Sequence, residues 1–224
     1  EATIREALGS NEAIDKIASQ SYSHRNGFSK ITIKNSNGEK HRLHVYKVGA
    51  KAELNIHNHR WDFQSTILCG RLPMYLYEVI EGNTHHLHIY RRIDGTYTIT
   101  FVKKVGIIES PLIEYVAGQM YEMPNNLHHR IGLVGELTIT HMVTRKTDQD
   151  TCDLINIENK SSYGEEVTEQ PLTREQVVDN LNLILNRINK PLGCCWCSAV
   201  AAALLDTTRQ KEHWIALSAR LLLM

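Results

Sequence analysis

The chain has 224 residues, which is enough for one sizeable core with or without a helical annex. Lysine plus arginine and aspartate plus glutamate each number 25, so the formal net charge is zero. A neutral chain has no general electrostatic attraction to nucleic acid or to an anionic membrane. We therefore expect a small-molecule partner, and neither nucleic acid nor a membrane.

The cysteines form an odd and clustered set without the regular spacing of a disulfide framework. They are Cys69, Cys152, Cys194, Cys195 and Cys197. The last three do not match the spacing of zinc-binding cysteine pairs, and we interpret them as packing residues at the start of a helix. No signal-like segment opens the chain, and the longest apolar run, 194–205, is too short to span a bilayer. These features predict a cytoplasmic protein.

The first 20 residues repeat apolar side chains at helical intervals, interrupted at Gly9-Ser10-Asn11. This pattern predicts two short helices or one broken helix. From Lys30 the period changes to two, and β-forming residues dominate as far as the segment ELTITHMVTR. About ten short runs separated by turn residues favour an antiparallel sandwich or barrel over a βαβ fold.

After Lys146 the sequence becomes polar, and helical signals return at Thr173. Thr173 and Gln176 form a capping box, followed by an apolar face that ends before Pro191. Two more helices are expected at about 195–205 and 207–222, the second with a stripe through Trp214 that suits core packing or a dimer contact. The predicted organisation is an N-terminal helical segment (1–28), a β-barrel (29–146), a linker or surface excursion (147–172) and C-terminal helices that pack on the barrel or a partner (173–224).

Two histidines in the segment HNHRWDF carry the strongest chemical signal. His57 and His59 are two apart, so on a strand both imidazoles project to the same side. A chelating pair of this kind needs a third ligand from elsewhere, and His129 is a candidate. Alternation along the strand places Leu127, His129 and Ile131 on one face, so we prefer His129 to His128.

The segment around His57 and His59 and the segment from Gly118 to His129 resemble the two metal-binding motifs of the cupin superfamily. The resemblance covers roughly residues 40–146, and HNHRWDF is also similar to an uncharacterised group of bacterial and phage cupins with an HxHxWDF start. It implies a mainly β protein with an antiparallel cupin-type barrel or jelly roll, flanked by N-terminal helices and a C-terminal helical extension. It also implies that His57, His59 and His129 hold a metal ion.

The sequence departs from the cupin pattern in four places. Seven residues, where the family has five, separate Gly49 from His57, and Gln64 stands where a glutamate ligand is expected. Asn126 replaces a glycine, and Leu133 replaces an asparagine. A neutral amide leaves the charge of the metal uncompensated, which favours an anionic ligand such as a thiolate, enolate or carboxylate.

The lack of the glutamate is also a feature of the three-histidine thiol dioxygenases, which oxidise a metal-bound sulfur with O2. This likeness predicts a mononuclear non-haem Fe(II) oxygenase acting on a small anionic substrate. We expect a divalent metal, Fe(II) first, with Ni, Cu, Zn and Mn as alternatives. The alternative functions are a metal-dependent isomerase or decarboxylase, and a non-catalytic ligand-binding or assembly cupin. A homodimer is compatible with either.

Further residues are candidates for the pocket. Gln64 is expected as a weak fourth ligand or a hydrogen-bonding group, and His141 as an inward-facing residue near the metal. Tyr77 and Tyr75 alternate with apolar residues, so one of the two sets must face the cavity. We expect the tyrosines to shape it, with Tyr77 in a catalytic role and Tyr75 in substrate binding. Arg60 and Arg71 suit recognition of a substrate carboxylate. The run His85-His86-Leu87-His88 is interpreted as a solvated hairpin, although His86, His88 and Tyr90 are candidates for the pocket mouth.

Overall fold

The computed structural model describes residues 1–24, 27–36, 38–50, 53, 55–93, 96–145, 147, 149–156 and 170–188. The chain divides into two compact units, Glu1–Leu185 and Asn186–Met224. The two helices expected at 195–205 and 207–222 lie outside the described residues, as do Cys194, Cys195 and Cys197.

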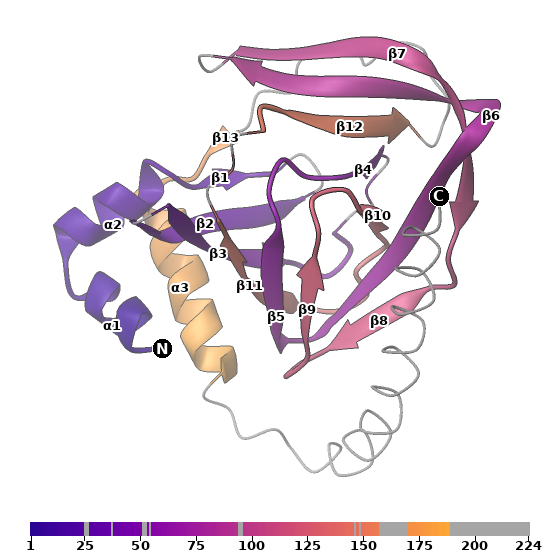
Figure 1. The fold of residues 1–224 in the computed structure, drawn as a ribbon. Helices are drawn as coiled ribbons and strands as arrows, with labels where there is room; N and C mark the ends of the chain where they lie inside the picture. Colours follow the sequence, from indigo (N-terminus) through magenta and orange to yellow (C-terminus); the bar gives the residue numbers. More distant parts are fainter. Residues whose placement is uncertain are drawn as a thin grey trace, which may run out of the picture. The chain divides into compact units, whose positions relative to one another are not determined.

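The described structure is mainly β and antiparallel, as predicted, with helices at both ends of the described residues (Figure 1). A seven-stranded sheet, here called sheet A, has the order β13-β1-β2-β3-β11-β5-β9. Its strands are β1 (Tyr22–Ser23), β2 (Phe28–Ser36), β3 (Glu39–Tyr46), β5 (Phe63–Cys69), β9 (Met120–Met123), β11 (Thr138–Thr144) and β13 (Gln170–Pro171).

The second sheet, sheet B, has the order β10-β4-β12-β6-β7, with β8 also paired to β6. Its strands are β4 (Asn55–His57), β6 (Arg71–Ile93), β7 (Thr96–Glu109), β8 (Ile113–Val116), β10 (His128–Ile131) and β12 (Thr151–Asn156). β12 falls in the segment that sequence analysis assigned to a linker. It pairs with β4 through Ile155 opposite Ile56, which shows that this polar stretch contains an inner strand.

β6 joins two segments that the sequence pattern separated, and it is 23 residues long. The strand is continuous, but its pairing with β7 skips from Ile80 to His85, so the register shifts around Gly82. A Cβ on Gly82 would lie 2.7 Å from the backbone nitrogen of Gly106, so the two strands can approach here only because both residues lack side chains. The first part of β6 pairs with β8 and β10, and the second part pairs with β12.

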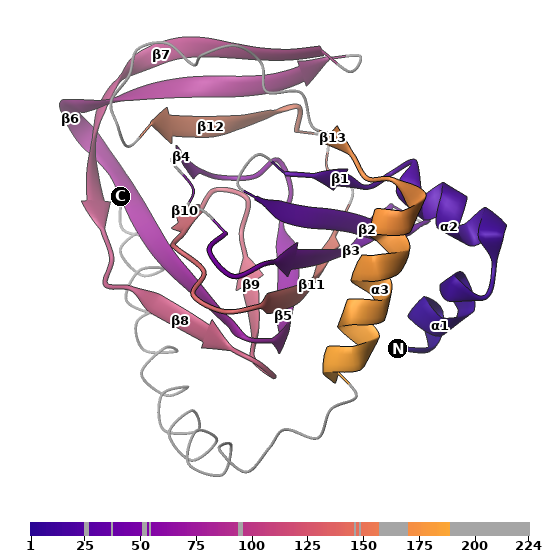
Figure 2. The same ribbon diagram turned by 180° about the vertical axis from the view of Figure 1, so that it is seen from behind.

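The helices are α1 (Ala2–Leu8), α2 (Asn11–Ala18) and α3 (Arg174–Ile188), and both N-terminal helices match the predicted broken pattern. The capping box is present, because Thr173 N donates to Gln176 Oε1 at 2.9 Å and Gln176 N donates to Thr173 Oγ1 at 3.2 Å. Figures 1 and 2 show α2 and α3 beside β1, β2 and β3. No described helix has the length and apolarity needed to cross a membrane.

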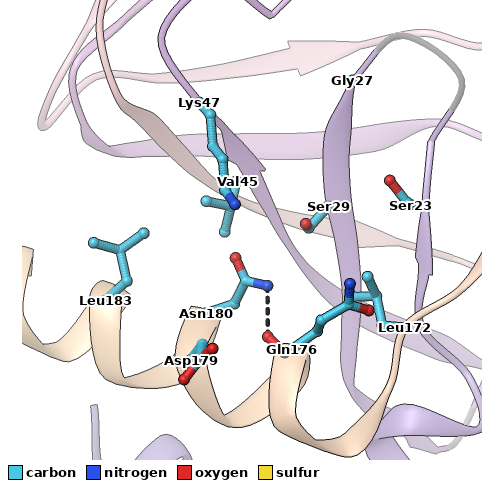
Figure 3. A pocket seen from close by; sticks show the side chains of 10 residues that line it. All are labelled: Ser23, Gly27, Ser29, Val45, Lys47, Leu172, Gln176, Asp179, Asn180 and Leu183. Atoms are coloured by element: carbon cyan, nitrogen blue, oxygen red, sulfur yellow. Dashed lines mark hydrogen bonds between the residues drawn. The ribbon is translucent and has the colours of Figure 1, made fainter.

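At the end of β3 both faces of sheet A are buried, because Leu43, His44, Val45 and Tyr46 are all buried. Val45 on β3 is fully buried and lines a small pocket with Ser29 of β2 and Leu183 of α3, so this face of the sheet lies under the helix (Figure 3). The opposite face carries Phe63, Ser65 and Tyr121, all buried, and points toward sheet B. A sheet with two buried faces loses the simple apolar-polar alternation that would identify its inner side.

Two glycines provide a matched test of the turns. Gly49 and Gly70 both have φ of +78°, but a Cβ on Gly70 would lie 2.3 Å from Leu137 O, whereas nothing lies within 4 Å of one on Gly49. We expect Gly49→Ala to cost about 1 kcal/mol, the price of the left-handed conformation alone, and Gly70→Ala to cost at least about 2 kcal/mol more. Urea denaturation of both variants measures the difference, and equal losses would contradict it.

Burial of His44 predicts a dependence of stability on pH. Burial, together with the charges of Lys30, Arg42 and His24, holds its pKa well below the usual range. Below about pH 6.5 the His44 imidazole binds a proton in the unfolded chain but not in the folded chain. The free energy of unfolding therefore falls as pH drops, by up to about 1.4 kcal/mol per pH unit for each such histidine. His44→Phe should reduce that slope by about half a proton near pH 6.5 and by nearly one proton near pH 5.5, as measured by urea titrations across this range. An unchanged slope would contradict this assignment.

Candidate metal centre

Strand pairing brings two of the predicted ligands together. His129 on β10 lies directly opposite His57 on β4, and on its other side it lies opposite Leu76 of β6. Residues opposite one another in an antiparallel pair project to the same face, so both imidazoles leave sheet B on the side that faces sheet A. The centres of the two rings are 4.6 Å apart.

His59 completes the group from the loop after β4. Its backbone N donates to Asn125 O at 3.3 Å, which ties this loop to the one that precedes β10. Its ring centre is 5.0 Å from those of both His57 and His129. The ligand atoms of the three histidines lie within 4.8 Å of one another. Two donors that are each about 2.1 Å from one ion lie at most about 4.2 Å apart, so small side-chain movements would bring these nitrogens onto a single ion.

The protonation of the three rings suits metal binding. Burial, reinforced by neighbouring histidines, holds the pKa values of His59 and His129 well below the usual range, so both are neutral at pH 7. Nδ1 of His57 faces Asn55 O at 3.3 Å, and Nδ1 of His129 faces Leu127 O at 3.4 Å. With Nδ1 as the donor in each contact, Nε2 keeps its lone pair for a metal. The three histidines fit a divalent metal site.

Aromatic side chains surround the group on the side of sheet A. Phe63 of β5 meets the His59 ring edge-on at 4.9 Å, and Trp61 stacks on it at 6.0 Å. The guanidinium groups of Arg42 and Arg60 lie 5.5 and 4.9 Å from the centre of the Trp61 ring. The positive charges of Lys30 and Arg42 also lower the pKa of His59, after burial and the other two histidines. The surroundings therefore combine a hydrophobic wall with positive charge.

Two predicted pocket residues of sheet A point away from the histidines. Gln64 lies on the opposite face of β5 from Phe63, and its Nε2 donates to Glu122 Oε1 at 3.3 Å. His141 lies opposite Thr66, on the same face of sheet A as Val45, which lies beside α3. Its Nε2 is 3.2 Å from His41 Nδ1. We expected Gln64 and His141 to lie beside the metal, but both point to the face of sheet A that is turned away from the histidines. Ile139, the buried apolar residue on the face of His141, lies opposite Val45, on the side of sheet A that faces away from sheet B.

The tyrosines of β6 also face away. Tyr77 and Tyr75 alternate with Leu76, which shares its face with His129. The Tyr77 hydroxyl donates to Glu109 and accepts from Arg130 Nε at 2.5 Å, and the Arg130 guanidinium lies 4.4 Å from the Tyr75 ring centre. Tyr77 belongs to a separate core cluster of sheet B: Ile56, Tyr77, Leu87, Val105 and Ile155. A tyrosine can be part of this second core. The alternation therefore predicted correctly that Tyr75 and Tyr77 share one face of β6, but not that the other face carries the histidine group.

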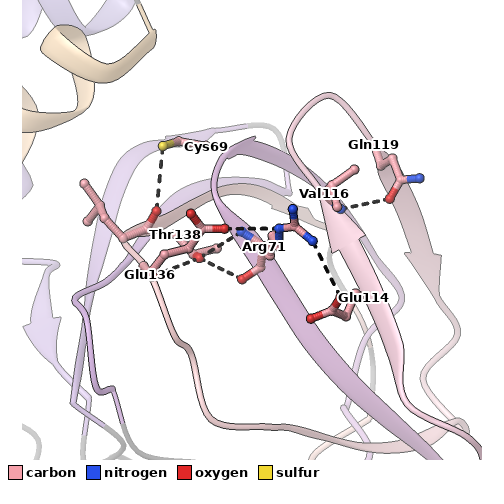
Figure 4. Close-up of polar contacts among 8 residues, drawn as sticks. Cys69, Arg71, Glu114, Val116, Gln119, Glu136 and Thr138 are labelled. Atoms are coloured by element: carbon pink, nitrogen blue, oxygen red, sulfur yellow. Dashed lines mark hydrogen bonds and ion pairs between the residues drawn. The ribbon is translucent and has the colours of Figure 1, made fainter. Parts of the chain in front are cut away.

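The two predicted arginines have different surroundings. Arg60 lies beside Trp61 at the histidine group, as a pocket role requires. Arg71 is 60% exposed and pairs with Glu114 at 3.9 Å and Glu136 at 3.4 Å (Figure 4). Carboxylates already occupy its guanidinium, so this position does not support the expected role in substrate binding.

The histidines of β6 belong to another part of sheet B. His88 is buried and lies opposite Leu154, which in turn lies opposite His57, so His88 shares the face of the ligands two strands away. The rings of His86 and His88 both contact Phe101 of β7 edge-on. The interpretation of this run as a solvated hairpin is therefore wrong for His88.

Sequence reasoning did not select Glu53, Arg42 and Lys30. Glu53 is buried, and its Oε2 lies 3.9 Å from His57 Nδ1. The sequence carried a signal for two of them. Glu53 precedes His57 by four residues, and Arg42 alternates with His44 on a strand rich in β-formers. Charged residues at inward positions of otherwise apolar strands are costly to bury and so suggest a function.

Comparisons with known proteins give matches among solved structures only. No protein-family profile matches the chain, and neither does any curated protein. A cupin-2 domain protein from Shewanella frigidimarina matches at 16% identity and TM-score 0.31, covering 53% of this chain and 80% of its own. A cupin superfamily protein from Desulfitobacterium hafniense matches at 13% and 0.33, covering 58% and 87%. KdgF from a Halomonas species matches at 9% and 0.33, covering 57% and 89%.

These structural neighbours include cupins, the superfamily whose motifs the sequence resembles. The three-histidine group occupies the positions that the resemblance implied and fits a cupin metal site. The matches have low identity and cover little more than half of the chain, so they carry no information about substrate.

Replacement of a ligand tests the metal centre directly. We expect His129→Gln to weaken Zn²⁺ or Co²⁺ binding at least about 100-fold, because one of three protein donors is lost. His141→Gln is the control, since this ring points away from the group. Titration with either metal, followed by calorimetry, measures both variants. Equal affinities for the two variants would contradict the assignment.

Proposed function

We propose that the protein is a mononuclear non-haem Fe(II) enzyme of the cupin type, an oxygenase acting on a small anionic substrate. The observation that carries the proposal is the three-histidine group beside Lys30, Arg42 and Arg60, with Gln64 facing elsewhere. Three neutral donors retain the full charge of a divalent ion, which favours an anionic ligand. Fe(II) bound there would supply the redox chemistry with O2.

The residues of the chain would have separate roles in this proposal. His57, His59 and His129 would hold the ion from one side through neutral nitrogens. Arg42 and Arg60, both against Trp61, would attract and orient a carboxylate or thiolate, because a guanidinium offers several donors in a fixed plane. Phe63 and Trp61 would exclude water from the ring of His59, which strengthens these electrostatic contacts.

The oxygenase proposal is tested with an oxygen electrode on Fe(II)-loaded protein and a panel of thiols and small carboxylates. We expect O2 uptake with at least one anionic compound and its loss in His57→Ala. Absence of uptake across the panel, with metal and ligand still bound, would instead indicate a non-catalytic binding protein. Conversion of a carboxylate without O2 uptake would indicate an isomerase or decarboxylase.

The role of Arg42 is tested with the compound found active. Arg42→Met should raise KM about 10-fold or more, since it removes a charge-assisted contact of about 1.5–3 kcal/mol, and should not weaken binding of the metal alone, because it removes a positive charge from beside the site. Arg71→Met is the matched control, because its guanidinium pairs with Glu114 and Glu136. An equal KM in the two variants would show that Arg42 does not contact the substrate.

A further inference from the structure

Glu53 is a carboxylate buried beside the histidine group, and only 8% of its surface is exposed. Its backbone N donates to Ile131 O at 2.9 Å, and its Oε2 accepts from Ile131 N at 2.8 Å. The residue is thus fixed to β10, two positions after His129. The backbone and the side chain of Glu53 are each tied to Ile131 by one hydrogen bond, so the strand defines the position of the carboxylate.

The same Oε2 lies 3.9 Å from Nδ1 of His57. That nitrogen faces the carbonyl of Asn55, so the carboxylate is on the Nδ1 side of the ring, away from the nitrogen that would bind a metal. At this distance Glu53 acts on the imidazole through its charge and not through a direct hydrogen bond. A negative group behind a ligating histidine makes the ring a better donor and favours one orientation.

The charges around the site give Glu53 a further effect. Lys30 and Arg42 add positive potential that opposes the entry of a cation, and Gln64 neither carries a charge nor faces the site. The carboxylate of Glu53 opposes this positive potential from within the protein. It also raises the pKa values of Tyr46 and Tyr121, in each case as a contribution secondary to burial.

We propose that Glu53 is the positioning residue of this metal centre: it supplies the negative charge that the site lacks at Gln64 and holds the imidazole of His57 in its ligating orientation. The inference rests on the proposed metal site and adds a residue that lies before the histidine pair in the sequence. The carboxylate of Glu53 belongs to the segment before β4, whereas the cupin resemblance implies a glutamate on β5, at the position of Gln64.

The test separates the charge of Glu53 from its structural hydrogen bond. Glu53→Gln keeps an oxygen that can accept from Ile131 N but removes the charge. We expect Co²⁺ affinity, measured by competition with a chromophoric chelator, to fall about 10–100-fold. The visible spectrum of bound Co²⁺ should also change, because the His57 ring is less well oriented. A purely structural role would lower stability without altering either measurement on the folded protein.

Glu122→Gln is the matched control, because it removes a carboxylate that contacts Gln64 on the outward face of the sheet. It should leave Co²⁺ affinity and spectrum unchanged. Wild-type affinity and spectrum in Glu53→Gln would overturn the inference while leaving the metal site intact. Failure of the wild-type protein to bind Co²⁺ would instead overturn the metal site and the proposed function together.

If Glu53→Gln does not fold, Glu53→Asp tests the role of the charge instead. It keeps the charge on a shorter side chain, so Co²⁺ affinity should stay within about threefold of wild type if charge is the determinant. A loss as large as that in His57→Ala would overturn the inference.

Discussion

The site depends on the register between β4 and β10. His57 and His129 lie opposite one another across this short pairing, and their common orientation follows from it. A shift of one residue would turn one imidazole toward the core cluster on the other face of sheet B. The register is well supported, because β10 also pairs with β6 over four residues and β4 also pairs with β12 over three. Positioning of the two donors is therefore a property of the whole sheet.

Much of the fold followed from periodicity in the sequence. The broken N-terminal helix, the capping box at Thr173 and most strands appear where period and turn residues predicted them. Two local features were not predicted. The continuous strand β6 was expected as two strands separated by a loop, and β12 was expected as part of a linker because polar residues surround Leu154 and Ile155. In both places, pairing with distant strands decides the structure, and no local pattern reports that pairing.

The candidate site was predicted in part, for a physical reason. Parity along the strands correctly grouped His129 with Leu127 and Ile131, and His141 with Ile139. Parity does not say which group faces the site when both faces of a sheet are buried. Sheet A is covered by helices on one face, and sheet B has a second core beneath Tyr77. Residues that only face alternation supported, such as His141 and Tyr77, were therefore assigned to the wrong side.

The three histidines differ in how firmly the backbone holds them. β10 is hydrogen-bonded on both sides, and His57 ends a strand that is also paired on both sides. His59 instead lies in a loop, linked to Asn125 by one backbone hydrogen bond and bordered by Trp61 and Phe63. Two donors are thus fixed and the third can adjust. Ions of different radius can be accommodated by a small movement of that loop, so selection among metals would rest on supply and charge more than on the size of a rigid cage.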